Sequence, residues 1–219
     1  MDAAASEGFF ESYLNHLGLT YQRHVPVRGD KNVDFRIEGD PAILCDVKEV
    51  RASAIGSPDI DAYSHIREDL AELRKKFGPC RPRIPVLLVT VNFSARLFTG
   101  FSIARAMLGD VGAEISPNGR GEFHHLPRGN AAMTRSHHTV LSGILLFDCG
   151  IKGNHALFRN PYATHPVPDH WFPAVRRVIV DRDATEEHLK ALANITFWSC
   201  DEQASQSGLL PKEAKRRMP

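Results

Sequence analysis

Three charged residues, Asp34, Asp46 and Lys48, lie among apolar neighbours in one short stretch of the chain. In an extended segment alternate side chains share a face, so Asp46 and Lys48 are expected on one face and Val47 on the other. Two carboxylates can hold one divalent cation, and a lysine ammonium beside them can contact an anionic group or an attacking water. These residue types and their spacing are therefore compatible with a site for a divalent metal ion.

A β-hairpin would bring the two aspartates together. Two strand-like runs, residues 33–37 and 42–50, flank a strong turn signal that contains glycine and proline. If residues 39–41 form a three-residue loop, Asp34 stands opposite Asp46, with Cβ atoms about 4.5–5.5 Å apart. Both carboxylates could then reach one Mg²⁺. A loop one residue longer or shorter would turn Asp34 to the other face.

The hairpin alone supports two interpretations. Unpaired carboxylates among core side chains carry a substantial desolvation cost, which a bound cation would offset. A structural salt bridge, in which Asp34 and Asp46 pair with Lys48 on a half-exposed sheet face, would offset it equally well. Both interpretations stay open at this point.

The elements that must position these residues follow an α/β order. The sequence predicts a helix that begins after Ser6 and ends at Gly18, and a buried strand that is covered on both faces over residues 84–91. Further elements are predicted as strands at residues 21–27, 141–147 and 156–159, helices at 57–77, 102–108 and 185–193, and a long polar loop at 109–139.

The predicted fold class is α/β with a central mixed sheet, because the hairpin pairs antiparallel strands. One domain over residues 1–219 is expected, with its core in residues 6–95 and 140–160. Residues 109–139 are expected to form a loop or insertion, and residues 200–219 a solvated, flexible tail.

Composition sets the class of protein. The chain has 219 residues, 42% of them hydrophobic and 24% charged, with a net charge of +1, all ordinary for a globular protein. It contains no signal-peptide pattern and no long apolar run, so a cytoplasmic protein without a membrane partner is expected. The four cysteines are too widely spaced for a zinc ribbon. They are Cys45, Cys80, Cys149 and Cys200.

The hairpin residues resemble the motif of the PD-(D/E)XK nuclease superfamily. Eleven residues separate Asp34 from the sequence Asp46-Val47-Lys48, and Val33 stands where the name-giving proline often is. The resemblance covers about the first 95 residues. It implies a restriction-endonuclease-like α/β/α sandwich with peripheral C-terminal additions. It also implies hydrolysis of nucleic-acid phosphodiesters that depends on Mg²⁺ or Mn²⁺, with DNA preferred over RNA and endonucleolytic cutting.

The first predicted helix adds a third carboxylate to the resemblance. Residues 7–18 are similar in spacing to archaeal-type Holliday-junction resolvases, in which a glutamate precedes the helix-ending glycine by eleven residues. This places Glu7 in the site, with Glu11 one turn later as the substitute. An ordinary solvated helix charge is the alternative for either glutamate.

The resemblance also implies a role for each residue. Asp34, Asp46 and the backbone carbonyl of Val47 would hold the metal ion, and Glu7 would bind it through water or bind a second ion. Lys48 would contact the attacking water or the scissile phosphate. Glu49 points away from this face and is expected to be structural.

Nucleic acid as a partner requires cations beyond the catalytic residues. The histidine pairs 124–125 and 137–138 are expected to be hydrogen-bonded loop residues, and a homodimer would suit cleavage of both strands. Two other functions stay open: a nucleic-acid-binding module that keeps this fold without catalysis, and an assembly subunit. The candidate phosphate-contacting residues are Arg51, Arg67, Arg74, Lys75, Lys76, Arg120, Arg128 and Arg135.

Overall fold

The computed structural model describes residues 3–29, 31–50, 62–93, 103, 106–109, 131–149, 154–172 and 175–179. The main elements of this part of the chain are two helices and seven strands. In chain order they are α1 (Ala3–His16), β1 (Tyr21–Arg28), β2 (Lys31–Ile37), β3 (Ile43–Glu49), α2 (Ala62–Phe77), β4 (Val86–Asn92), β5 (Gly143–Asp148), β6 (Asn154–Arg159) and β7 (Arg176–Ile179). Residues 103 and 106–108 are also helical, within the helix predicted at residues 102–108.

All seven strands belong to one sheet, and their order across the sheet is their order in the sequence. Strands β1, β2 and β3 pair antiparallel, whereas β3, β4 and β5 run parallel. Strand β6 is antiparallel to β5, and β7 is parallel to β6. The prediction of a mixed sheet in an α/β protein is therefore confirmed.

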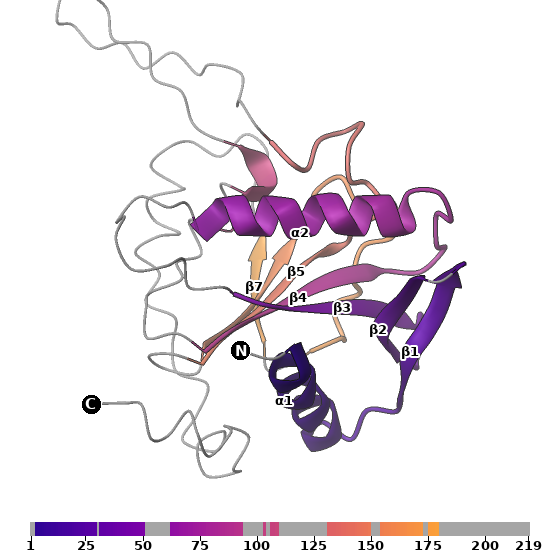
Figure 1. The fold of residues 1–219 in the computed structure, drawn as a ribbon, viewed down its shortest axis with the longest axis vertical. Coiled ribbons are helices and arrows are strands. Elements are labelled where there is room, and N and C mark those ends of the chain that lie inside the picture. Colours follow the sequence, from indigo (N-terminus) through magenta and orange to yellow (C-terminus); the bar gives the residue numbers. More distant parts are fainter. Residues whose placement is uncertain are drawn as a thin grey trace, which may run out of the picture.

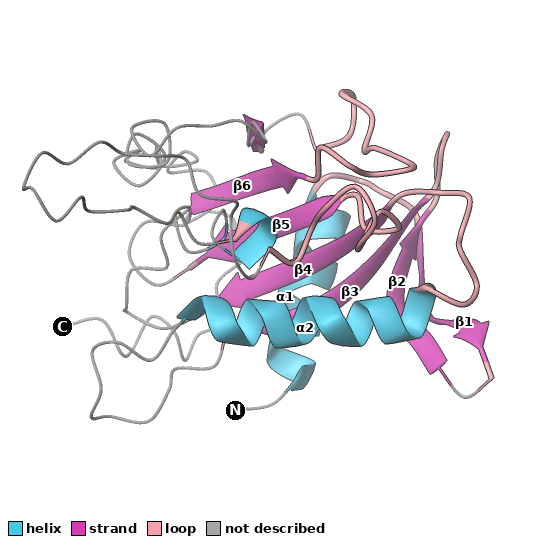
Figure 2. Cartoon of the chain, turned by 90° about the horizontal axis from the view of Figure 1, so that it is seen from above, coloured by secondary structure: helices cyan, strands magenta, loops and turns pink. Residues whose placement is uncertain are grey.

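The two helices cover opposite faces of this sheet (Figure 1). Helix α2 packs its apolar stripe of Ile66, Leu70, Leu73 and Phe77 on one face. Helix α1 packs aromatic side chains on the other, where Phe147 of β5 is central. Figure 2 looks down on α2, which lies over the part of the sheet that contains β3 and β4. Every residue of β4 is buried, as expected for a strand covered on both faces.

Helix α1 begins earlier than the sequence suggested. Ser6 was expected to cap it, yet Ser6 is buried inside the helix, which starts at Ala3. Three alanines precede Ser6, and alanine has the highest helix propensity, so they extend the helix by a turn. Gly18 follows the helix with a φ of 65°, a conformation that glycine adopts readily, and it ends the helix as predicted.

The hairpin register agrees with the sequence, although its loop is longer. Phe35 pairs with Cys45 and Ile37 with Ile43, the register that sets Asp34 opposite Asp46. The strands stop pairing before the turn, so residues 38–42 form a five-residue connection instead of the expected three. The loop is longer than expected by one residue on each side, so the face on which each side chain lies is unchanged.

The C-terminal part of the described chain extends the sheet. Strands β5 and β6 lie where strands were predicted, and β7 was not predicted. The helix expected at residues 185–193 and the tail lie outside the described residues.

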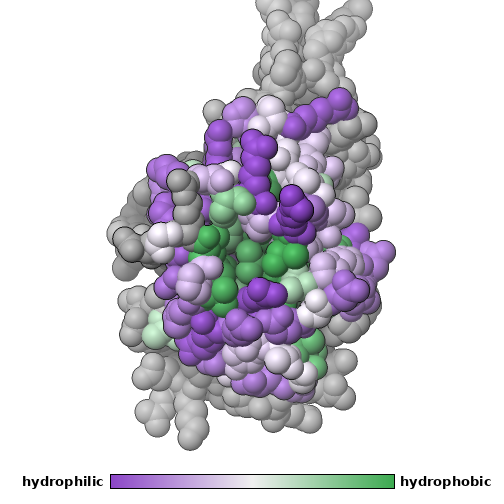
Figure 3. Space-filling model, turned by 90° about the vertical axis from the view of Figure 1, so that its right-hand side faces the viewer, coloured by the Kyte–Doolittle hydropathy of each residue, from purple (hydrophilic) through white to green (hydrophobic). Residues whose placement is uncertain are grey.

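Seen from the side on which β1 lies, the surface has an apolar hollow bordered by hydrophilic side chains (Figure 3). Among the described helices, none has the length and apolar character to cross a membrane.

Candidate functional site

Strand β3 carries two charged residues on the face that α2 covers. Its alternate residues Ile43, Cys45 and Val47 belong to the core beneath α1, so Asp46 and Lys48 face α2. The Asp46 side chain is 1% exposed, whereas Lys48 reaches partly into solvent. Asp46 and Lys48 therefore lie on one face of β3 and Val47 on the other, as strand alternation predicts.

Asp34 lies where β2 and β3 part. The last pair of the ladder is Phe35 with Cys45, and beyond it the Val47 backbone N–H donates to Asp34 Oδ2 at 2.6 Å. In a continued antiparallel ladder this N–H would bond a backbone carbonyl of β2. Because the N–H and C=O of one strand residue point to the same edge, the Val47 carbonyl also points toward β2.

The Asp34 carboxyl is electrostatically strained. Burial raises its pKa above the ordinary value, and the neighbouring Asp46 carboxylate raises it further, as does Glu7 to a lesser extent. The Val47 N–H and the Lys76 ammonium act in the opposite direction without restoring the ordinary pKa. Asp34 is partly buried and Asp46 is fully buried, and two carboxylates that repel each other in this way are suited to share a cation.

Lys76 of α2 is the neighbour that the sequence did not place in the site. Its ammonium pairs with Asp46 Oδ1, while the Lys48 ammonium lies 3.6 Å from Asp46 Oδ2. Lys76 had been assigned to phosphate contacts together with its helix neighbours. Residues four apart share one side of a helix, so Lys76 lies on the same side of α2 as Glu72. Glu72 lies 3.5 Å from Lys48, and this spacing was the signal that could have placed Lys76 beside the aspartates.

Lys48 is held as an ammonium. Burial lowers its pKa, but the charges of Asp46, Glu72, Asp69 and Asp34 outweigh burial and leave the pKa raised. A proton is therefore firmly bound at Nζ at neutral pH. Lys48 is consequently suited to stabilise negative charge and not to accept a proton.

Glu7 and Glu11 of α1 are engaged by β1. Arg23 donates to Glu7 Oε2 at 2.9 Å and to Glu11 Oε2 at 3.1 Å, and Tyr21 donates to Glu11 Oε1 at 2.9 Å. Glu7 is still near enough to raise the pKa of Asp34. Within the described residues, no three acidic, histidine or cysteine side chains converge in a metal-binding group.

A row of buried polar residues on β4 and β5 continues the α2-facing side beyond Lys48. Thr90 pairs with Lys48 across the parallel ladder, and in the part of the chain that the structure describes its buried Oγ1 has no hydrogen-bond partner. Two residues on, Asn92 donates from Nδ2 to Asp148 Oδ1 at 2.9 Å. This row was not predicted from the sequence, although polar residues at alternate positions of an apolar strand are a recognisable signal.

The candidate phosphate-contacting residues are only partly placed. Arg74, Lys75 and Arg135 are exposed and Arg67 is half-buried. Positions 51, 120 and 128 and the histidines at 124 and 125 lie outside the described residues. His137 accepts or donates a 3.0 Å hydrogen bond with Ser136 Oγ, as expected for a loop histidine.

Comparison with known proteins gives no relative. The chain matches no protein-family model, and neither a curated protein nor a solved structure is significantly similar to it. The function must therefore be inferred from the site itself.

Proposed function

We propose that this protein is a metal-dependent nuclease that hydrolyses nucleic-acid phosphodiesters, DNA in preference to RNA, and cuts within the strand. One observation carries the proposal. The Asp34 carboxyl, bound to the backbone of β3, lies close enough to Asp46 for its pKa to rise, and Lys48 follows on the same face as Asp46. This arrangement of Asp34, Asp46 and Lys48 supports the proposal.

The residues present fit a divalent cation. A positive ion between Asp34 and Asp46 would relieve their repulsion. The Lys76 ammonium already supplies one positive charge at Asp46. Asp34, Asp46 and the Val47 carbonyl, which points toward β2, would hold Mg²⁺ or Mn²⁺. Lys76 would have to turn away, and Glu7 would join only if Arg23 released it.

In this mechanism the ion would lower the pKa of a bound water and polarise the phosphate. The chain itself would do the rest. Lys48 keeps its proton and would neutralise charge that develops on the phosphate oxygens. Asp34, whose pKa is raised by burial and by the Asp46 carboxylate, would orient the attacking water.

The arrangement of elements supports the finer fold proposal, a restriction-endonuclease-like sandwich. A helix, three antiparallel strands, a second helix on the opposite face and a strand parallel to β3 follow one another. This order places the hairpin aspartates at the point where β2 leaves β3. The cations of α2 and a homodimer remain part of the same proposal, as the means to hold and cut a duplex.

A second candidate function also has an observation in its favour. Lys76 forms a salt bridge with Asp46, and Arg23 forms one with each of Glu7 and Glu11. Such pairs would serve a binding or assembly module that keeps the fold without catalysis. The two candidates differ in whether a divalent cation displaces the lysine.

Cleavage assays test the proposal directly. Plasmid, linear duplex, single-stranded and branched DNA, and RNA, are incubated with Mg²⁺ or Mn²⁺ and the wild-type protein. We expect Lys48→Ala to slow cleavage by about 10²–10³-fold, the usual loss for one charge-stabilising donor. Lys31→Ala, an exposed lysine at the start of β2 that is assigned no contact with substrate, is the matched control and should cut at the wild-type rate.

Two results would contradict the proposal. Cutting that survives Lys48→Ala would come from another site or another protein. Binding of DNA without any cutting, together with an unchanged affinity for divalent ions in Asp34→Ala, would favour the binding module.

A further inference from the structure

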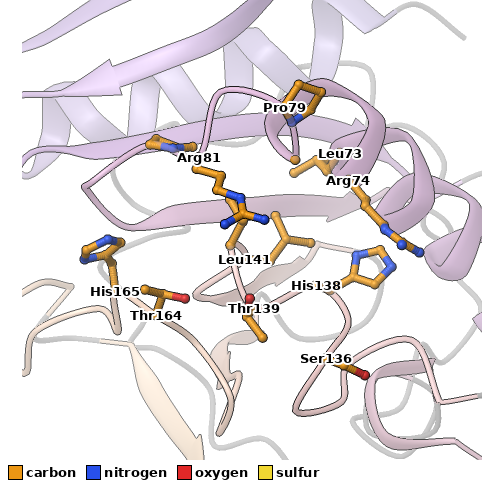
Figure 4. Close-up of a pocket in the computed structure, with 13 residues that line it drawn as sticks. Leu73, Arg74, Pro79, Arg81, Ser136, His138, Thr139, Leu141, Thr164 and His165 are labelled. Carbon is orange, nitrogen blue, oxygen red and sulfur yellow. The ribbon is translucent and has the colours of Figure 1, made fainter.

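A cavity of about 600 Å³ opens on the other flank of α2, away from the aspartates (Figure 4). Glu72 and Lys76 point toward β3, and Arg74, midway between them, is turned by about half the helix circumference to the opposite side. Arg74 lines this cavity. The two sites therefore lie on opposite flanks of one helix.

The lining combines cations with an apolar floor. Arg74 and Arg81 contribute guanidinium groups, and His138 and His165 contribute imidazoles. In Figure 4 the Arg81 guanidinium lies over Leu141, between the rings of His165 and His138. Among the described residues that line the cavity none is acidic. Its apolar members are Leu73, Pro79, Pro82, Val140 and Leu141.

The two arginines are available for a ligand. Within the described part of the chain, neither Arg74 nor Arg81 forms a salt bridge, whereas Arg23, Arg36 and Arg159 each do. A guanidinium without a carboxylate, beside an apolar floor, favours an anion whose remaining part is apolar or planar.

The backbone around the cavity is held in an uncommon conformation. Arg81 has a φ of 40° and His138 a φ of 55°, a region that residues with side chains rarely adopt. Such residues are concentrated at ligand-binding sites. His138 Nδ1 is buried and has no hydrogen-bond partner among the described residues. Burial together with the charge of Arg74 lowers the pKa of His138 to about 4, so the ring is neutral.

Buried polar residues keep the cavity wall in place. Asn160 Nδ2 donates to the carbonyl oxygens of His138 at 3.1 Å and Leu141 at 2.7 Å. Ser142 Oγ donates to the carbonyl oxygen of His165 at 2.5 Å, and the Thr164 N–H donates to the Thr139 carbonyl at 2.7 Å. Two separate loops are thereby joined into one wall, so the cavity exists before any ligand arrives.

We propose that this cavity binds a nucleotide, with its phosphate on Arg74 and Arg81 and its base on the apolar floor. The volume lies within the range of about 300–1,000 Å³ that is typical of small-molecule sites. The flanking imidazoles and guanidinium groups offer stacking and hydrogen-bonding partners to a base. The inference does not depend on the proposed nuclease function, because the aspartates take no part in it.

Calorimetric titration of the full chain in EDTA tests this site without any divalent ion. AMP is the probe, and adenosine and inorganic phosphate are its two halves. We expect AMP to bind at least about tenfold more tightly than either half, because each half lacks one set of contacts. An oligonucleotide that ends in a phosphate then distinguishes a free nucleotide from the end of a strand.

Matched variants locate the binding. Arg74→Gln and Arg81→Gln should each weaken AMP binding by about tenfold or more, the usual loss of a charged hydrogen bond. Lys75→Gln and Arg83→Gln remove exposed cations of the same segments that do not line the cavity, and should leave the affinity unchanged. Circular dichroism verifies that each variant is folded.

The proposal is overturned if AMP does not bind at millimolar concentration, or if either half binds as tightly as AMP. Equal losses in the cavity variants and their controls would overturn it as well. Lys48→Ala, which tests the nuclease proposal, should bind AMP like the wild type, so failure of one proposal is distinguishable from failure of the other.

Discussion

The charge state of Asp34 links the site to the stability of the fold. Its pKa in the folded protein is raised by burial and by Asp46, so ionisation of this carboxyl opposes folding. The stabilising contribution of the protonated form is fully present below the unfolded pKa of about 3.9 and is lost as the pH rises through the folded pKa.

Asp34→Asn should therefore stabilise the protein at neutral pH, by on the order of 1 kcal/mol, a common size for one substitution. The difference should vanish near pH 3, where both proteins are uncharged at this position. Urea unfolding at several pH values measures it. A variant that is less stable than the wild type at neutral pH would contradict the assigned repulsion.

The Asp46–Lys76 pair makes a second residue-scale prediction. Lys76→Met would leave the buried Asp46 carboxylate with only the more distant Lys48, and should destabilise the fold by about 3 kcal/mol. Added Mg²⁺ should restore much of this loss if the ion occupies the place of the lysine, because a ligand stabilises the state that binds it. Thermal unfolding with and without Mg²⁺ tests both parts.

Two comparisons make that result interpretable. Lys75→Met is the control on the same helix, because its side chain is exposed. Lys76→Met combined with Asp46→Asn should lose most of the destabilisation and all of the Mg²⁺ effect. A single variant as stable as the wild type would mean that the pair contributes nothing.

The residues of the candidate site differed in how far the sequence could predict their positions. The register of Asp34 and the shared face of Asp46 and Lys48 were predictable because strand alternation and hairpin register are local properties. Lys76 was not placed in the site, because which helical residue reaches Asp46 depends on how α2 is rotated over the sheet. That rotation is set by packing of the whole apolar stripe, which no short segment encodes.

At the scale of elements, two glycines differ in how much space surrounds them. A Cβ at Gly143 of β5 would lie 2.4 Å from the backbone oxygen of Phe158 in β6, and a backbone oxygen cannot turn aside. Gly143→Ala should therefore destabilise the sheet by about 2 kcal/mol or more, as overpacked sites do. The same change at Gly8 in α1 meets no atom within 4 Å and should stabilise the helix by about 0.5–1 kcal/mol.

Urea unfolding of the two alanine variants measures this contrast under identical conditions. Equal effects of the two substitutions would show that the β5–β6 contact is looser than described. An unaltered far-ultraviolet circular dichroism spectrum is the control that both variants keep the sheet.

The helices and strands were predictable where a pattern of apolar residues extends over their length. The apolar stripe of α2 and the uninterrupted run of β4 were evident from the sequence. Strand β7 was not, because it has four residues and begins with two arginines, so it has no pattern of its own. Its pairing with β6 depends on the sheet that is already present. The cavity beside α2 combines three segments far apart in the chain, and no motif marks it.

At the scale of the whole molecule, the two cores share one sheet. Phe147 is buried beneath α1 and Leu70 beneath α2, both without exposed surface. Phe147→Ala and Leu70→Ala should each cost about 3–5 kcal/mol and lower the same unfolding transition. Fluorescence and circular dichroism should give coincident curves for each variant. Separate transitions would mean that the two faces unfold independently.

The strand order has a consequence for how the protein is made. Because every strand pairs with its neighbours in sequence, each one that leaves the ribosome finds its partner strand already synthesised. The connections between β1 and β2, β2 and β3, and β5 and β6 are short and close at low entropic cost, so these pairs can form as translation proceeds. The aspartates, both lysines beside them and the helix that covers them all precede Gly78, so the candidate catalytic side chains are in place while β5, β6 and β7 are still to be synthesised.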